Sequence, residues 1–196
     1  MIREALITKL PGRMAQFMRC CLLLGGCYGA PVSADHATIE NERTLLVNGI
    51  YRASAHVVFD MDEKVQEALD NGVPLVVDLE IELVRKRDWL WPEVIVEHKQ
   101  HYMMYFHALS RRYIVKDVNK DVQQSYRYID DALNAIGDVY DVPLIAVDEL
   151  YAKADYRVRM RALFDVEALP TPIRLWAYFS SDWKLTGGWT QWRLKP

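Results

Sequence analysis

Cysteine is scarce in this chain of 196 residues and is confined to its N-terminal part. Cys20, Cys21 and Cys27 lie close together, and no cysteine follows them. Cleavage after Ala34 would leave a mature chain without cysteine, which excludes disulfide bonds, a thiolate nucleophile and cysteine ligands for a metal. We therefore interpret the three cysteines as small hydrophobic residues of a leader.

Long hydrophobic runs are missing too. The apolar run from Cys20 to Ala30 spans about eleven residues, whereas a membrane-spanning helix needs about 20. Arg13 and Arg19 precede this run, and a small-x-small sequence follows it and ends at Ala34, so residues 1–34 have the three parts of a secretory signal peptide. We expect export to the periplasm, one folded domain over residues 35–196, and no transmembrane span in the mature chain.

The leader allows a second interpretation. The sequence LGGC that ends at Cys27 resembles a lipobox, in which the cysteine is lipid-modified and becomes the new N-terminus. The alternative to a soluble periplasmic protein is therefore a lipoprotein anchored to a membrane through Cys27. The start codon is open in the same way, because Met14 would begin a more compact signal than Met1.

An excess of basic residues is also absent. Residues 1–34 carry four Lys or Arg and one Glu, so the rest of the chain has 20 basic against 26 acidic residues, a net charge of -6. A protein that binds nucleic acid regardless of sequence needs a dense basic face to neutralise phosphates. We therefore expect no nucleic-acid partner.

What the chain does contain is a pattern of period two. Asn48-Gly49 between apolar runs is typical of a tight hairpin turn, and apolar residues alternate with charged ones from Leu75 to Leu83. We expect strands on either side of this turn, over 44–47 and 50–59, and further strands over 75–83, 94–109, 111–118, 122–128, 142–147 and 155–164, short helices over 62–72 and 129–136, and a terminal hairpin or loop and strand over 179–194. Short antiparallel strands with two connecting helices predict a mainly β fold, an antiparallel β-sandwich in the immunoglobulin-like range.

These segments, in this order, resemble a known family. The stretches VNGIYRASAHVVF, EALDNGVPLVVDLEIEL, YMMYFHALSRRYIV, DALNAIG and AYFSSDWKLTGGW are similar to the proteobacterial exported family catalogued as domain of unknown function 4390. The resemblance spans residues 37–192. It implies a secreted or envelope protein, often encoded near a membrane sensor kinase of the nitrogen-regulation type, and it carries no activity or catalytic residue.

Three histidines invite a metal interpretation. On a strand, His101 and His107 share a face but stand about 20 Å apart, and His98 points to the opposite face. No pair of them chelates one ion without a partner from elsewhere in the chain. We therefore expect ordinary surface or cross-strand histidines, with no metal and no cofactor.

Signatures of hydrolases and nucleotide-binding proteins are incomplete. Ser180 and Ser181 lack the Gly-x-Ser-x-Gly elbow that exposes a serine nucleophile. Gly187-Gly188 lacks the lysine and the helix that follow a phosphate-binding loop. The sequence therefore names no catalytic residue.

Three arginines alternate with apolar residues near the C-terminus. Arg157, Arg159 and Arg161 thus lie along one sheet face and are candidates for an anion-binding or lipid-headgroup site. The simpler interpretation is cross-strand pairing with the equally periodic Asp78, Glu80 and Glu82. The two interpretations differ in whether the two segments are adjacent strands.

Tryptophans mark a candidate partner site. Trp89 and Trp91 lie in the turn RKRDWLWPE between two long strands, beside three cations. Either they fold back and plug the end of the sandwich, or they stay exposed and contact a partner. Arg111 and Arg112 are further candidates for that site, although their side chains point to opposite faces.

The leading hypothesis is an exported accessory or sensory domain that binds a protein partner, with a neighbouring sensor kinase as one candidate, rather than catalysing a reaction. The alternatives are a hydrolase whose site is assembled from distant residues around Ser181 or His101, and a passive structural component of the envelope. A pocket that joins Ser181 or His101 to an acid or base would favour the hydrolase.

Processing of the leader gives the first testable prediction. We expect the mass of the mature protein, measured after expression with its own leader, to correspond to a chain that begins at Asp35. Cys27→Ser should leave this mass and the yield unchanged, because the residue is removed with the leader. A lipid-bearing N-terminus at Cys27, lost in the Cys27→Ser variant, would instead establish a lipoprotein.

Overall fold

The computed structural model describes residues 37–151, 154–169, 171, 174 and 187–194, all within one unit of the chain, Asp35–Pro196. The predictions for residues 1–34, Cys27 included, lie outside the described residues, as do Ser180, Ser181 and most of the segment 179–194. Among the described residues, no helix is long and apolar enough to cross a membrane.

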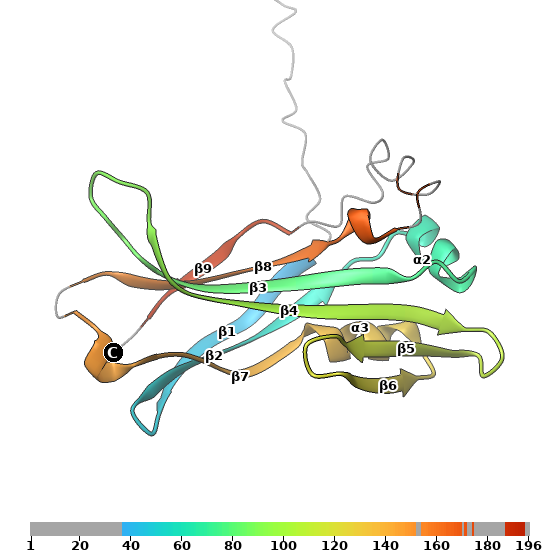
Figure 1. The fold of residues 1–196 in the computed structure, drawn as a ribbon, viewed down its shortest axis with the longest axis horizontal. Coiled ribbons are helices and arrows are strands. Elements are labelled where there is room, and N and C mark those ends of the chain that lie inside the picture. Colours follow the sequence, from blue (N-terminus) through green and yellow to red (C-terminus); the bar gives the residue numbers. More distant parts are fainter. Residues whose placement is uncertain (1–36, 152–153, 170, 172–173, 175–186, 195–196) are drawn as a thin grey trace, which may run out of the picture. The chain divides into compact units, whose positions relative to one another are not determined.

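The described strands form two antiparallel sheets (Figure 1). The smaller sheet has the order β1 (Ala37–Val47), β2 (Ile50–Phe59), β7 (Asp138–Ala146). The larger has the order β6 (Val122–Tyr126), β5 (Arg112–Asp117), β4 (Glu93–His107), β3 (Leu75–Arg85), β8 (Tyr156–Phe164), β9 (Thr190–Arg193). This confirms the predicted mainly β fold, and the two sheets are those of a β-sandwich.

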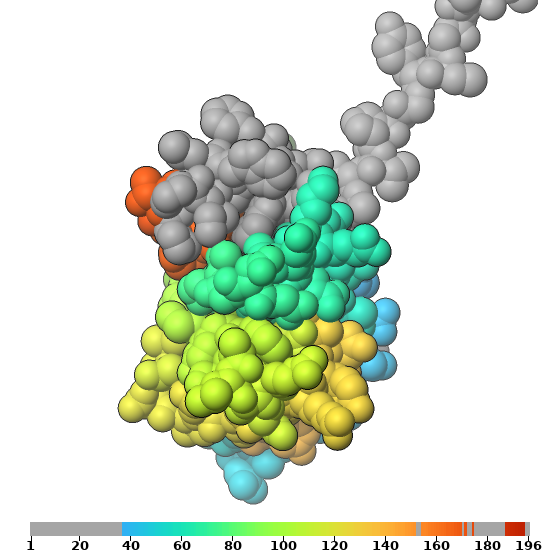
Figure 2. Space-filling view, turned by 90° about the vertical axis from the view of Figure 1, so that its right-hand side faces the viewer, coloured from blue at the N-terminus to red at the C-terminus, as the bar shows by residue number. Residues whose placement is uncertain are grey.

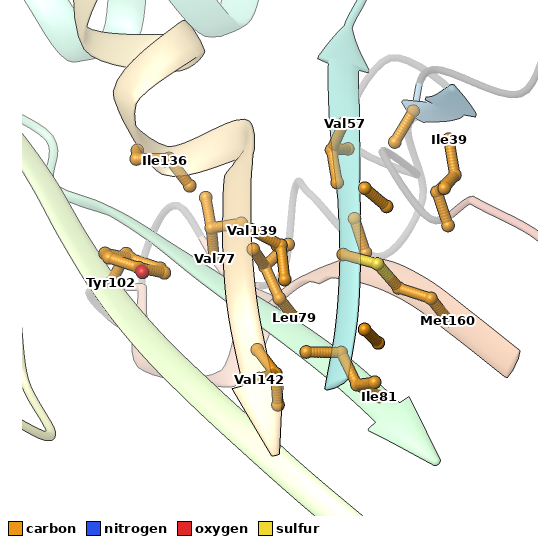
Figure 3. Close-up of a cluster of buried hydrophobic side chains, with 14 of the residues drawn as sticks. Ile39, Val57, Val77, Leu79, Ile81, Tyr102, Ile136, Val139, Val142 and Met160 are labelled. Atoms are coloured by element: carbon orange, nitrogen blue, oxygen red, sulfur yellow. The ribbon is translucent and has the colours of Figure 1, made fainter. Parts of the chain in front are cut away.

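Strand β3 is the centre of the larger sheet, between β4 and β8. Its alternate residues Leu79, Ile81 and Leu83 are fully buried, as the period of two predicts. Leu79 and Ile81 belong to one cluster with Val139 and Val142 of β7, so the core lies between the two sheets (Figure 3). Each buried Leu or Ile side chain stabilises the fold by about 1.5–3 kcal/mol.

The predicted hairpin at Asn48-Gly49 is confirmed. Val47 pairs with Ile50, and the two turn residues have φ of 52° and 78°. Positive φ at both central positions matches the strand twist, and Asn and Gly adopt it at low cost. The turn therefore sets the register of β1 on β2.

The two predicted helices are confirmed as short connections. In α2 (Glu63–Asp70) the Asp62 side chain accepts a hydrogen bond of 2.8 Å from the backbone N–H of Lys64 and caps the first turn. The Tyr113 hydroxyl of β5 donates to Asp70 at 2.7 Å, and burial together with this carboxylate raises the pKa of Tyr113 to about 12. Helix α2 and the β4–β5 turn thus lie at one end of the domain, which Figure 2 shows face on.

Helix α3 (Ile129–Gly137) leads from β6 of the larger sheet into β7 of the smaller one. The sequence predicts an apolar side of Ile129, Leu133 and Ile136; the helix buries Leu133 and Ile136 together with Ala132, and Ile129 is half-buried. Its last residue, Gly137, lies against the backbone of β2, where an added Cβ would meet the Val57 carbonyl oxygen at 2.1 Å. Only glycine allows this close approach of helix and strand.

Strand β7 begins at Asp138, four residues before the predicted segment 142–147. The sequence pattern hid these residues because Asp138, Tyr140 and Asp141 are exposed and the pairing with β2 is interrupted by register shifts. A bulge breaks the alternation on which a strand prediction depends.

Gly137 gives a test of the helix–strand contact. We expect Gly137→Ala to lower the free energy of unfolding by at least about 2–3 kcal/mol, because the new methyl group overlaps a backbone carbonyl that has no freedom to move aside. Gly49→Ala, in open space but at positive φ, should cost about 1 kcal/mol. Denaturant unfolding measures both, and equal effects would contradict the close approach.

Candidate functional site

The loop between β3 and β4, residues 86–92, carries the two candidate tryptophans. Trp89 is 96% exposed and Trp91 is 89% exposed, and Leu90 between them is 65% exposed. The alternative in which they fold back and plug the sandwich is therefore wrong. Large aromatic side chains are seldom left this exposed, so an apolar tip of this kind indicates a contact surface.

The base of this loop is held by charge. Glu93 at the start of β4 accepts hydrogen bonds from Arg85 and pairs with Arg87 at 2.6 Å. Hydrogen bonds from Arg87 and Arg85 lower the pKa of Glu93, so the carboxylate stays charged. The Lys86 N–H also donates to the Asp155 carbonyl at 2.9 Å, beside the start of β8. Ion pairs and a backbone hydrogen bond thus hold the base of the loop, while the side chains of Trp89, Leu90 and Trp91 at its tip are exposed.

A second apolar tip lies at the same end of the domain (Figure 1). Next to the β1–β2 turn, Leu45, Leu46 and Val47 are 56%, 50% and 40% exposed. The sequence missed this surface, because a run of apolar residues beside a hairpin turn predicts burial. Only the position of β1 at the edge of the smaller sheet leaves it exposed.

The connection between β7 and β8 joins the two tips. The Val147 N–H, at the start of the 3-10 turn η1 (Val147–Glu149), donates to the Gly49 carbonyl at 2.9 Å. Tyr151 lies under the Arg85 guanidinium at 4.9 Å from ring centroid to Cζ. We name the combined surface the apolar end; it consists of Leu45, Leu46, Val47, Trp89, Leu90, Trp91, Val147 and Tyr151, all exposed.

The structure separates two of the predicted partner-site residues from the tryptophans. Arg111 and Arg112 lie at the turn between β4 and β5, the opposite end of β4 from Trp91. Strand β4 has 15 residues, which places about 45–50 Å between them. Neither arginine, of which the sequence allowed at most one to join any given site, therefore lies near Trp89 and Trp91, because a strand this long spans the whole sheet. Arg112 instead donates to the side chain and carbonyl of Ser125.

Two of the three C-terminal arginines lie beside carboxylates predicted for them. Strand β8 pairs with β3 so that Arg159 faces Glu82 and Arg161 faces Glu80. Each Nε donates to its carboxylate at 2.6 Å, which confirms cross-strand pairing for these two. Arg157 faces Val84 and pairs with Asp155 at 3.4 Å instead. Anion binding by Arg157, Arg159 and Arg161 stays a prediction. Each of these guanidinium groups already pairs with a carboxylate of the domain.

Trp189 packs over a charge ladder, by which we mean the ion-paired side chains of Glu80, Glu82, Lys99, Arg159 and Arg161. Its ring lies 4.4 Å from the guanidinium carbons of both Arg159 and Arg161. On the other side, Lys99 of β4 bridges Glu80 and Glu97 at 3.1 Å each. Burial raises the pKa of Glu80, but the hydrogen bonds from Arg161 and Lys99 outweigh it and lower the pKa overall. The ladder is thus a compensated network that stabilises the outer face of the larger sheet.

The histidines of β4 are distributed as their spacing predicts. His101 lies on the outer face, where its Nδ1 is 2.7 Å from an Asp78 oxygen. His98 lies on the other face, and its buried Nε2 has no hydrogen-bond partner. His107 contacts Ser110 at 2.8 Å near the turn. Within the described residues, no group of three or more His, Cys, Asp or Glu is placed to hold a metal.

Comparison with known proteins adds one match. The family model described as "Domain of unknown function (DUF4390)" matches residues 34–193. The chain belongs to the DUF4390 family. No curated protein and no solved structure matches it. The DUF4390 match contains both tips of the apolar end, the charge ladder and the pockets, and it confirms the resemblance inferred from the sequence.

Two of the surface pockets of the DUF4390 domain bring an acid close to a tyrosine, lysine or histidine. One, of about 280 Å³, lies between the β5–β6 hairpin and the end of α3, and its polar lining includes Tyr102, Asp117 and Lys120. The other, of about 490 Å³, lies on the smaller sheet, where His56 Nδ1 is 2.8 Å from Asp138. Neither is lined by His101. Neither of these two pockets therefore supports a hydrolase site around His101.

Glu80 gives a test of the charge ladder in the DUF4390 domain. Its pKa is lowered in the folded chain, so the stabilisation is present above the ordinary value of 4.5 and is lost as the pH falls below it. We expect Glu80→Gln to cost about 1.5–3 kcal/mol near pH 7 and progressively less as the pH falls below 4.5.

Glu97→Gln is the matched control, because Glu97 contacts the same Lys99 from an exposed position. We expect it to change the free energy of unfolding by less than about 0.5 kcal/mol. Urea titrations at several pH values measure these differences. A cost of Glu80→Gln that is independent of pH would contradict the lowered pKa.

Proposed function

We propose that this DUF4390 protein is an exported accessory or sensory domain of the cell envelope that binds a protein partner through its apolar end. The proposal rests on one observation: Trp89 and Trp91 are almost fully exposed on a loop whose base is anchored. The leader and the family resemblance support export, and they imply a periplasmic location or a lipid anchor at Cys27.

The composition of the apolar end suits a protein interface. Tryptophan is enriched among residues that dominate binding energy, because one side chain buries a large area with little loss of conformational freedom. The tips of β1–β2 and β3–β4 stand on paired strands, so their backbones are held before binding occurs. Binding to such a preformed surface avoids much of the cost of ordering loops.

The shape of the surface indicates the kind of partner. Trp89, Leu90 and Trp91 project from a loop and do not line a cavity, so the complementary surface is a hydrophobic groove. The base of the loop carries Arg85, Lys86 and Arg87 against Asp88 and Glu93, of which Glu93 pairs with both arginines, so one positive charge remains. A partner with a hydrophobic groove bordered by acidic residues fits this arrangement, and a membrane sensor kinase is the partner class that the family resemblance implies.

The other functional predictions have less support. The His101–Asp78 pair has the form of an acid–base pair, but no nucleophile of the described residues contacts it, so the hydrolase stays a prediction. A passive structural component of the envelope would have no use for two exposed tryptophans, and it differs from the proposal in having no discrete partner.

The tryptophans give the test of the partner site. The chain with its own leader is captured from the envelope of its host, and the bound proteins are identified by mass spectrometry. We expect Trp89→Ser with Trp91→Ser to reduce the capture of a discrete envelope partner at least tenfold, since the variant removes the largest apolar contacts. The fold should be unaffected because both side chains are exposed.

Tyr140→Ser is the matched control, since Tyr140 is an aromatic residue that is 75% exposed on β7, outside the apolar end. It should capture the partner as the unchanged chain does. Equal capture by the tryptophan variant would contradict the site. Binding to phospholipid vesicles that needs both tryptophans, with no protein captured, would show that the end contacts a membrane instead.

A further inference from the structure

The edges of the two sheets are protected to different degrees. Free strand edges offer unpaired backbone groups to other chains, and proteins protect them with charges, prolines, bulges or short strands. Strand β7 contains Pro143 and register shifts, β1 has a register shift between Glu40 and Arg43, and β9 has only four residues. These edges are interrupted or short.

Strand β6, with five residues, is also short, but it lacks the other protections. Its sequence VQQSY contains no charge and no proline, and it pairs with β5 in an unbroken register. Its first four residues are exposed. Among the described strands only β5 pairs with it, and no described element lies beyond it in Figure 1. The edge is regular and open to another strand.

The sequence of β6 is complementary to itself. In an antiparallel pair of two β6 strands centred on Gln124, Val122 faces Tyr126 of the other copy, and Gln123 faces Ser125. Just outside the strand, Asp121 in the β5–β6 turn, with φ of 55°, and Arg127 after Tyr126 place opposite charges close together at each end of the pair. A β-branched residue opposite an aromatic one, and an acid opposite a base, are favourable cross-strand pairs.

We propose that β6 pairs with β6 of a second copy of this chain, antiparallel and about a twofold axis through Gln124. The two larger sheets then form one continuous sheet. Each contact away from the axis occurs twice, once on each side of it, as a twofold dimer requires. The pairing involves neither Trp89 nor Trp91, so it leaves the apolar ends free. It would present two partner-binding ends in one assembly.

Existing contacts of the edge are compatible with this pairing. Arg112 donates to the Ser125 carbonyl at 2.9 Å, but a carbonyl oxygen accepts two hydrogen bonds. Asp121 pairs with Lys116 at 2.7 Å and is 85% exposed at its side chain, so it is accessible from outside. Val122, Gln124 and Tyr126 also line the pocket of about 280 Å³, and the pairing places the two pockets of the dimer side by side.

The proposed interface is small, so the dimer should be weak and depend on concentration. Five residues of each strand supply few backbone hydrogen bonds and an area below that of a standard stable interface. Sedimentation equilibrium of the processed protein, from about 1 µM to about 1 mM, covers the range in which such affinities lie. A monomer throughout this range would overturn the proposal.

A charge exchange tests the register. We expect Asp121→Arg and Arg127→Asp, made singly, each to raise the dimer dissociation constant at least tenfold, because like charges then face each other at both ends. The double variant should restore dimerisation, since the opposite pairs are formed again. If Asp121→Arg acted only by removing the contact with Lys116, the second substitution would not restore dimerisation. A double variant no better than the single ones would overturn the proposal.

Crosslinking tests the axis in chains whose Cys20, Cys21 and Cys27 are replaced by Ser. Gln124→Cys should form a disulfide dimer on mild oxidation, since directly opposite residues have Cα atoms about 4.5–5.5 Å apart, within the range of a disulfide. Gln123→Cys is the control, because it faces Ser125 and not itself. Equal crosslinking of both, or a dimer lost only in the tryptophan variant, would overturn the proposal.

Discussion

The rest of the structure depends on the burial of both faces of β3. One face supplies the apolar residues that pack between the sheets, while the other carries Glu80 and Glu82, which are also buried. Buried carboxylates are costly unless they are paired, so the neighbouring strands must present cations at the facing positions. Arg159 and Arg161 of β8 and Lys99 of β4 meet this requirement. The alternation of β3 therefore constrains both of its neighbours.

This arrangement determines where the protein is available for binding. The cations of the outer sheet face are used within the domain, and Trp189 packs over two of them. The exposed apolar side chains gather instead where the strands end, at the tips beside Gly49 and Trp91. A rigid sheet with apolar loop tips is a common solution for recognition, because the scaffold holds the contact residues in place. The proposed partner site at the apolar end and the proposed pairing at the β6 edge use separate surfaces of one framework.

Features that depend on local chemistry were predictable from the sequence. The hairpin at Asn48-Gly49, the alternation along β3, the acidic start of α2 and the apolar sides of both helices follow from conformational preferences and from periods of 2 and 3.6 residues. These rules act over a few residues and need no knowledge of neighbours. They were sufficient to identify the strands, and with them a β-sandwich.

The candidate binding surface depends on how segments that are far apart in the sequence pair and pack in the fold. By itself, the sequence determined that β3 has a charged face and that tryptophans lie in the following turn, and it predicts an export leader. Only the tertiary structure decided that Arg159 and Arg161 neutralise that face, that Trp89 and Trp91 stay exposed, and that Arg111 and Arg112 lie at the opposite end of β4. The physical reason is that strand order and loop exposure arise from non-local pairing and packing, which no local period encodes.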